Sequence, residues 1–227
     1  REGNLSIETF AERLPDASPL DTSLALYEEN QASAITDFGL GNNLRVRFDS
    51  LLRGRHGNFS RVNFTSSPRV VGDDGLRVFQ GVDRSGNPLP NTIGVDIPLG
   101  FPAGTFTVAD LVDAINDDPF ASSIFRAEVI NGDDTTDIIG VDVELFSPVE
   151  LQGGGLEKLQ QNDDYFSEDS RLRAVLGDGI YYVGVSASGN SEYDPAIAGS
   201  GYGGRTEGEY QLQITYEPQV SKTDVIR

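Results

Sequence analysis

Apolar and polar residues alternate along much of the chain, which is the pattern of β-strands with one buried face. Turn-forming residues separate these segments, and the chain contains 26 glycines and 11 prolines. The clearest alternating segments are 5–9, 20–27, 43–49 and 210–216. Many short strands joined by turns predict a mainly-β fold.

One segment departs from this alternation and predicts an α-helix over 107–116. Thr107 is a suitable N-cap, and Asp110 stands three residues later, where a capping carboxylate belongs. Asp118-Pro119 then ends the helix, because the residue before proline disfavours helical backbone. The apolar face has the helical spacing i, i+3, i+4 and i+7, formed by Val108, Leu111, Val112 and Ile115.

The most informative stretch runs from Asn162 to Asn190 and begins with an acidic loop. A short strand over 172–176 follows, and then a turn at Gly177-Asp178-Gly179. The next run, 180–186, is too apolar for a strand with one face in water, so it predicts a strand in the core of a sandwich. We therefore expect a loop, a strand, a hairpin turn and a second strand here.

The 227 residues allow one large β domain or two small ones. The net charge is −19, from 36 acidic and 17 basic residues. Phosphate backbones and anionic membrane surfaces would be repelled, so we expect no nucleic-acid partner. No apolar run approaches the roughly 20 residues that span a bilayer, so we expect no membrane insertion. The acidity favours solubility or, since its Asp residues cluster in Gly/Asn/Ser-rich loops, calcium binding.

The chain contains no cysteine, which suits bacterial extracellular proteins that rely on metals instead of disulfides. It has neither a starting methionine nor a signal peptide, so we interpret it as a mature or excised piece.

Four motifs resemble the bacterial pre-peptidase C-terminal domain: NDDYFSEDSRL (162–172), GIYYVGVSASGN (179–190), YDP (193–195) and GGRTEGEYQLQI (203–214). That family is a secreted, jelly-roll-like antiparallel β-sandwich, found beside peptidases and in large surface proteins. In it, a strand of the type LDxxLxLY is followed closely by an NDD loop. Here LDTSLALYEEN stands at 20–30, far from the NDD loop.

This separation predicts that residues 31–157 are a domain inserted into a loop of the sandwich, since exposed loops tolerate insertions. The sandwich would then comprise 1–30 and 158–218, and 219–227 would be a tail or linker. The insert resembles small α+β repeat modules of large bacterial extracellular proteins, in which a helix packs on a small sheet. The family's first strands would lie upstream of residue 1, so a strand from another chain is one expected cover for the open edge.

Two groups of residues are candidate calcium ligands, because calcium prefers carboxylate and carbonyl oxygens. The alternative for the first group is a solvated acidic turn whose carboxylates cap backbone amides. For the second group, in the long loop 186–208, the alternative is a flexible loop with an Asp-Pro turn. The first group is Asp163, Asp164, Glu168 and Asp169 with Asp21, and the second is Asn190 and Asp194.

We expect no enzyme and name no catalytic residue. His56 is the sole histidine and lacks a matching nucleophile motif. A carboxylate pair for glycoside hydrolysis stays an open alternative, and among so many acidic residues the sequence singles out no pair. Tyrosines such as Tyr165 and Tyr202 either line a binding face or pack within loops, and the ligand is unknown.

The expected function is a non-catalytic structural or adhesive module of a large secreted or cell-surface bacterial protein, stabilised by calcium. One alternative is a module that binds polysaccharide or protein and accompanies a hydrolase. Another is a subunit of an extracellular filament or surface layer, completed by a neighbour's strand. The expected partners are other extracellular domains, copies of the chain itself, or polysaccharide.

Overall fold

The computed structural model describes residues 2–38, 44–68, 75–99, 105–136, 138, 148–165, 167–190, 192–197 and 200–219. The mainly-β prediction is confirmed, since 50% of the structure is strand and 11% is helical. The chain forms two compact units: unit 1 comprises Arg1–Glu29 and Leu156–Arg227, and unit 2 comprises Asn30–Gly155. The boundaries predicted from the sequence fall after residues 30 and 157.

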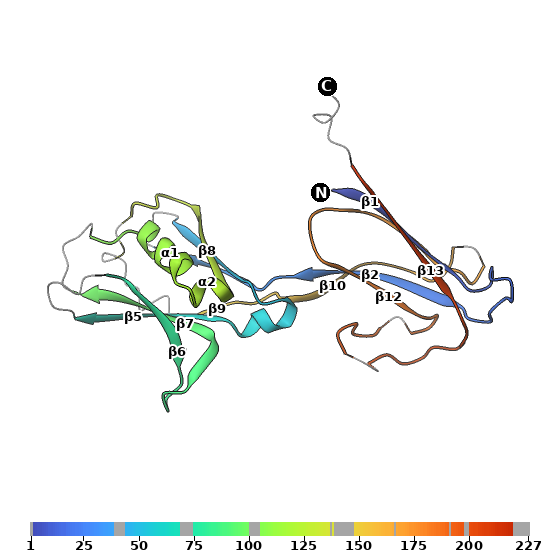
Figure 1. Cartoon of the computed structure of the whole chain (residues 1–227), viewed down its shortest axis with the longest axis horizontal. Helices are drawn as coiled ribbons and strands as arrows, with labels where there is room; N and C mark the ends of the chain where they lie inside the picture. The colour runs from blue at the N-terminus through green and yellow to red at the C-terminus, as the bar shows by residue number, and fades with distance from the viewer. Residues whose placement is uncertain are drawn as a thin grey trace, which may run out of the picture. The chain divides into compact units, whose positions relative to one another are not determined.

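Unit 1 contains two three-stranded sheets (Figure 1). The first has the order β11-β1-β13, and both of its pairings are antiparallel. The second has the order β10-β2-β12, with β2 and β12 antiparallel. The strands are β1 (Gly3–Phe10), β2 (Thr22–Asn30), β10 (Gly155–Asn162), β11 (Arg171–Leu176), β12 (Tyr181–Ala187) and β13 (Gln211–Pro218).

The two sheets of unit 1 share one apolar core, which makes the unit a β-sandwich. Alternation along β1 directs Leu5 and Ile7 inward, and Ile7 lies opposite Leu172 of β11. Leu24 and Leu26 of β2 enter the same core from the second sheet.

The hairpin predicted at Gly177-Asp178-Gly179 is wrong, because β11 and β12 belong to different sheets. β11 pairs with β1, with Leu172 opposite Ile7, and β12 pairs with β2, with Val183 opposite Leu26. The three residues therefore cross from one sheet to the other. Two glycines permit a turn of either kind, so the turn residues do not reveal which strands pair.

Unit 2 combines a three-stranded sheet of order β3-β4-β8 with a four-stranded sheet of order β6-β7-β5-β9. β5 and β7 pair in parallel. The elements are β3 (Ser33–Asp37), β4 (Arg45–Ser50), η1 (Gly54–Phe59), β5 (Arg61–Pro68), β6 (Arg77–Val82), β7 (Pro88–Leu99), α1 (Val108–Asp117), α2 (Ala121–Ile124), β8 (Phe125–Asn131) and β9 (Val149–Glu150).

Helix α1 confirms the helix predicted over 107–116. The Thr107 side chain accepts from the Asp110 amide, and the Asp110 carboxylate accepts from the Thr107 amide, which completes a capping box. The four predicted apolar residues are buried and join strand residues such as Phe48 and Ile93 in the core of unit 2.

The segment 32–38, at the start of the predicted insert, contributes to the core of unit 2. It includes β3, and Ala32 and Phe38 beside that strand are fully buried. The predicted tail lies outside the described residues from 220 onward. None of the helices among the described residues is long and apolar enough to cross a membrane.

Candidate functional site

Asp21 immediately precedes β2, and its backbone contacts both ends of the long loop of unit 1, residues 186–208. Its backbone amide donates to Thr206 Oγ1 at 3.0 Å, and its carbonyl accepts from the Ser188 amide at 2.9 Å. Both ends of the segment 188–206 are therefore tied to one residue, although they are far apart along the loop.

The Asp21 carboxylate lacks enough hydrogen bonds to offset the burial of its charge. Its Oδ1 is buried and has no hydrogen-bond partner among the described residues. The pKa of Asp21 is raised, first because burial disfavours the charged form, and further because Asp164 and Asp163 repel it. A hydrogen bond with the Ser188 side chain acts in the opposite direction. The fold thus brings three of the predicted ligands, Asp21, Asp163 and Asp164, within electrostatic reach of one another.

The fit to a metal ion is only partial. In the part of the chain that the structure describes, no group of three or more His, Cys, Asp or Glu side chains could hold a metal. Asp163 and Asp164 are exposed. The site supplies negative charge and one buried oxygen without a hydrogen-bond partner among the described residues, but its carboxylates do not form a preformed set of metal ligands.

Asp169 of the same predicted group lies in a different environment. Its Oδ1 accepts from the amides of Ala11 (2.6 Å) and Glu12 (3.2 Å), and its Oδ2 accepts from Arg13 Nε (2.5 Å). The side chain is completely buried, whereas that of Arg13 is 27% exposed. Burial raises the pKa of Asp169, but the Arg13 hydrogen bond and the two amides outweigh burial and lower the pKa overall.

Both oxygens of Asp169 are thus used inside the protein, as in the alternative of carboxylates that cap backbone amides. Glu168, the remaining member of the group, is exposed, and its carbonyl accepts from the Thr22 amide at 3.0 Å. The structure therefore separates Asp169 from Asp21, Asp163 and Asp164 in role.

Next to Asp169, three buried hydroxyls join the two sheets of unit 1. Thr9 Oγ1 and Thr22 Oγ1 are 2.6 Å apart, and the Ser170 amide donates to Thr9 Oγ1 at 2.9 Å. Ser170 Oγ donates to the Thr22 carbonyl. We call Thr9, Thr22, Asp169 and Ser170 the polar junction. The sequence pattern does not predict this cluster, although Thr9 lies on the same inward face of β1 as Leu5 and Ile7.

The second predicted group, Asn190 and Asp194, lies in the long loop and serves its turns. The Asn190 amide donates to the Ala187 carbonyl at 3.0 Å, and its side chain covers Gly201. Asn190 Oδ1 is buried with no hydrogen-bond partner among the described residues. Asp194 Oδ1 accepts from the Ala196 amide at 3.0 Å, an Asx turn that fits the predicted Asp-Pro turn.

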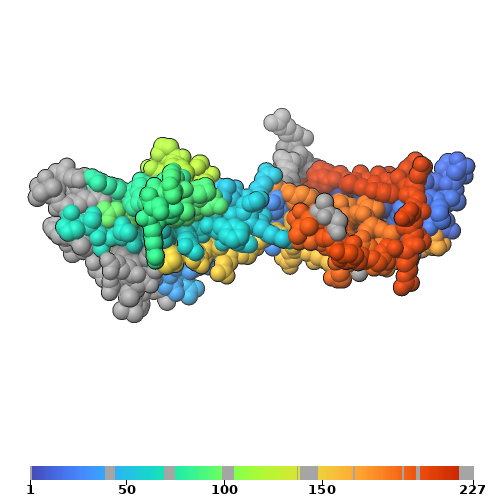
Figure 2. Space-filling view, turned by 90° about the horizontal axis from the view of Figure 1, so that it is seen from below, coloured from blue at the N-terminus to red at the C-terminus, as the bar shows by residue number. Residues whose placement is uncertain are grey.

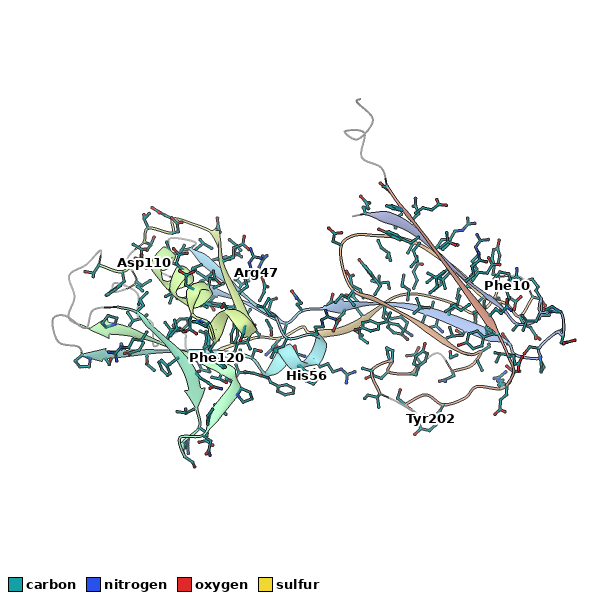
Figure 3. The ribbon with its side chains drawn as sticks, in the orientation of Figure 1. Phe10, Arg47, His56, Asp110, Phe120 and Tyr202 are labelled. Carbon is teal, nitrogen blue, oxygen red and sulfur yellow. The ribbon has the colours of Figure 1, made fainter. Side chains whose placement is uncertain are left out.

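Tyr193 anchors the long loop on the second sheet. Its hydroxyl lies over Gly184 of β12, where an added Cβ would stand 1.9 Å from the hydroxyl oxygen. Its ring meets that of buried Tyr27 edge-on, with centroids 6.1 Å apart. Burial raises the pKa of Tyr27, and the neighbouring Tyr193 hydroxyl raises it further. Tyr202, by contrast, is 87% exposed at the loop surface (Figure 3).

Unit 2 carries an open groove of about 790 Å³ that includes three carboxylates. Asp96 accepts from the hydroxyls of Thr65 (3.1 Å) and Ser67 (2.6 Å). Asp118 accepts from two amides at the start of α2. These two carboxylates have structural partners, so the groove does not favour the glycosidase alternative. His56, which lies on η1 (Figure 3), is not among the residues that line the groove.

Comparisons of the chain with protein-family models, with curated proteins and with solved structures found no match. The resemblance to the pre-peptidase C-terminal domain therefore stays a prediction, and the assignment of a function depends on the geometry of unit 1.

Proposed function

We propose that this chain is a non-catalytic structural module of a large secreted or cell-surface protein, and that Ca²⁺ stabilises it at Asp21, Asp163 and Asp164. The observation that carries the proposal is the buried Oδ1 of Asp21, which has no hydrogen-bond partner among the described residues. Nearly all buried polar atoms in proteins have a hydrogen-bond partner or another ligand, so we expect this oxygen to bind one.

Electrostatics favour a cation as that partner. Burial and the repulsion from Asp163 and Asp164 both disfavour the charged form of Asp21. Ca²⁺ supplies two positive charges and accepts six to eight oxygen ligands in flexible geometry. Because the carboxylates are not a preformed set of metal ligands, binding would require the exposed Asp163 and Asp164 side chains to turn toward Asp21.

The consequence for the fold follows from the backbone of Asp21. This residue ties both ends of the 188–206 segment, and the neighbouring Thr22 amide holds the Glu168 carbonyl of the acidic loop. Stabilising the Asp21 carboxylate would therefore hold two loops of the sandwich together. That is a structural role, and it needs no reacting group.

The test is a pair of thermal melts, one with excess EDTA and one with millimolar Ca²⁺. All eight tyrosines of the chain lie in unit 1 and no tryptophan is present, so tyrosine fluorescence reports on unit 1 alone. An ion at one hundred times its Kd stabilises the native state by about 2.7 kcal/mol, and we expect a rise of several degrees in Tm.

The variant Asp21→Asn should lose most of this calcium response. The matched control is Asp16→Asn, which removes the same charge from an exposed loop of unit 1 and should keep the response. If Ca²⁺ does not move the Tm of the wild-type chain, or moves that of Asp21→Asn equally, the calcium proposal is wrong.

A further inference from the structure

Strand β13 presents an apolar row at an open edge of unit 1. Among the described strands its one neighbour is β1, and all eight of its residues are exposed (Figures 1 and 2). Tyr216 and Ile214 lie opposite Leu5 and Ile7, and therefore on the side of the sheet that faces the core. Even so, Leu212 is 39% exposed and Ile214 is 53% exposed.

The register identifies which backbone groups of β13 face the open edge. The Gln219 amide donates to the Glu2 carbonyl at 2.8 Å. Glu2 and Gln219 are therefore a hydrogen-bonded pair, two residues along each strand from the pair Asn4 and Glu217. In an antiparallel pair, hydrogen-bonded positions alternate along the strand. The odd-numbered residues of β13 therefore bond to β1. The amides and carbonyls of the even-numbered residues, including Leu212 and Ile214, point away from it.

The phase of β1 supports this assignment. The Thr9 amide donates to the Ser170 carbonyl on the β11 side of the sheet, at 2.9 Å. Odd-numbered residues of β1 thus bond toward β11, which leaves its even-numbered residues to bond toward β13.

Over residues 211–216 β13 also lacks the features that usually protect an open edge, and Glu217 and Pro218 stand only at its C-terminal end. Proteins protect such strands with charges, prolines or bulges. Residues 211–216 contain no charge and no proline, in a chain of which 23% is charged. The opposite edge of the same sheet, β11, carries Arg171 and Arg173.

We propose that β13 pairs antiparallel with β13 of a second copy of this chain, with Ile214 opposite the partner's Ile214. In this register Leu212 lies opposite the partner's Tyr216, and Tyr216 lies opposite the partner's Leu212. Each of these three residue pairs would exchange two hydrogen bonds. The two sheets would become one continuous sheet with a continuous apolar row on the core side.

The register also explains why a second copy fits better than an unrelated strand. Gln211 faces the partner's Glu217, and Gln213 faces the partner's Thr215, so no two carboxylates lie opposite each other. Two chains of net charge −19 repel, and the neutral centre of β13 is a place where they can approach. A basic foreign strand would find one acidic residue here, Glu217.

Sedimentation equilibrium over a concentration series tests the proposal. We expect a mass that rises toward twice the 24.5 kDa of the chain, and a dimer fraction that increases with salt as the repulsion is screened. EDTA should leave the dimer intact, because the pairing does not involve the acidic loops, so this test is separate from that of calcium binding.

The decisive variant is Ile214→Lys, which places a charge at the centre of the row and should lower the dimer association constant at least tenfold. Val175→Lys is the matched control, because Val175 is 58% exposed on β11 of the same sheet. A synthetic peptide of residues 211–218 should compete with dimer formation without any substitution.

Three results would overturn the proposal. The wild-type chain could remain monomeric at every concentration, which would leave β13 to a strand from another protein or from elsewhere in a longer chain. Ile214→Lys could dimerise as the wild type does, or the peptide could have no effect, in which case copies associate through another surface.

Discussion

Replacing Asp169 with alanine should destabilise unit 1 more than any exposed acidic substitution. The change leaves the amides of Ala11 and Glu12 without their acceptor and takes one carboxylate from Arg13. Asp169 is fully buried, so water cannot replace the lost bonds without opening the polar junction.

The expected cost is about 3 kcal/mol at neutral pH. Breaking a buried ion pair typically costs about 3–5 kcal/mol. The lower end applies because the Arg13 side chain is 27% exposed and keeps a second carboxylate, that of Glu8, at 2.8 Å. Since domains are stable by only about 5–15 kcal/mol, this loss is a large part of the total.

Urea unfolding followed by tyrosine fluorescence measures the loss in unit 1 specifically, and Asp16→Ala is the control. The effect has a defined pH dependence. The pKa of Asp169 is lower in the folded chain than its ordinary value of 3.8. Its contribution is therefore complete well above pH 3.8 and disappears as the pH falls through the folded pKa.

The difference in unfolding free energy between wild type and Asp169→Ala should thus be constant from about pH 6 to 8 and should shrink in acid. A difference below about 1 kcal/mol at neutral pH would refute the assignment of a buried ion pair, and so would a difference that grows as the pH falls.

Two further substitutions test local features. Gly184→Ala adds a Cβ 1.9 Å from the Tyr193 hydroxyl, so Tyr193 must move. Limited proteolysis should then cut the 188–206 segment faster than in wild type. Equal cleavage rates would mean that Tyr193 does not anchor the loop. Thr107→Ala removes the capping box of α1 and should cost about 1 kcal/mol. Circular dichroism at 222 nm measures this loss, since α1 and α2 both lie in unit 2, and Thr107→Ser should retain most of the stability.

Local patterns predicted local structure well. The helix over 107–116 was predictable because its cap, its spacing of apolar residues and its stop signal all lie within the 13 residues from Thr107 to Pro119. Alternation in 5–9 and 210–216 likewise identified β1 and β13, since side chains on a strand alternate between its two faces whatever strand lies beside it.

Partner choice was not predictable in the same way. The motif around Gly177-Asp178-Gly179 indicates a turn, but only the fold decides that β11 joins β1 and β12 joins β2. The candidate site shows the same limit. Composition and loop context identified Asp21, Asp163 and Asp164 as acidic residues of interest, and their mutual repulsion arises from the folded arrangement.

The sequence alone thus determined the mainly-β class, the helix over 107–116 and the net charge of −19. The tertiary structure decided the roles of individual polar residues. Asp169 is one of 36 acidic residues until β1 and the acidic loop meet, when it becomes the buried partner of Arg13. The physical reason is distance, because hydrogen bonds and ion pairs depend on separations in space that segments more than a hundred residues apart reach only on folding.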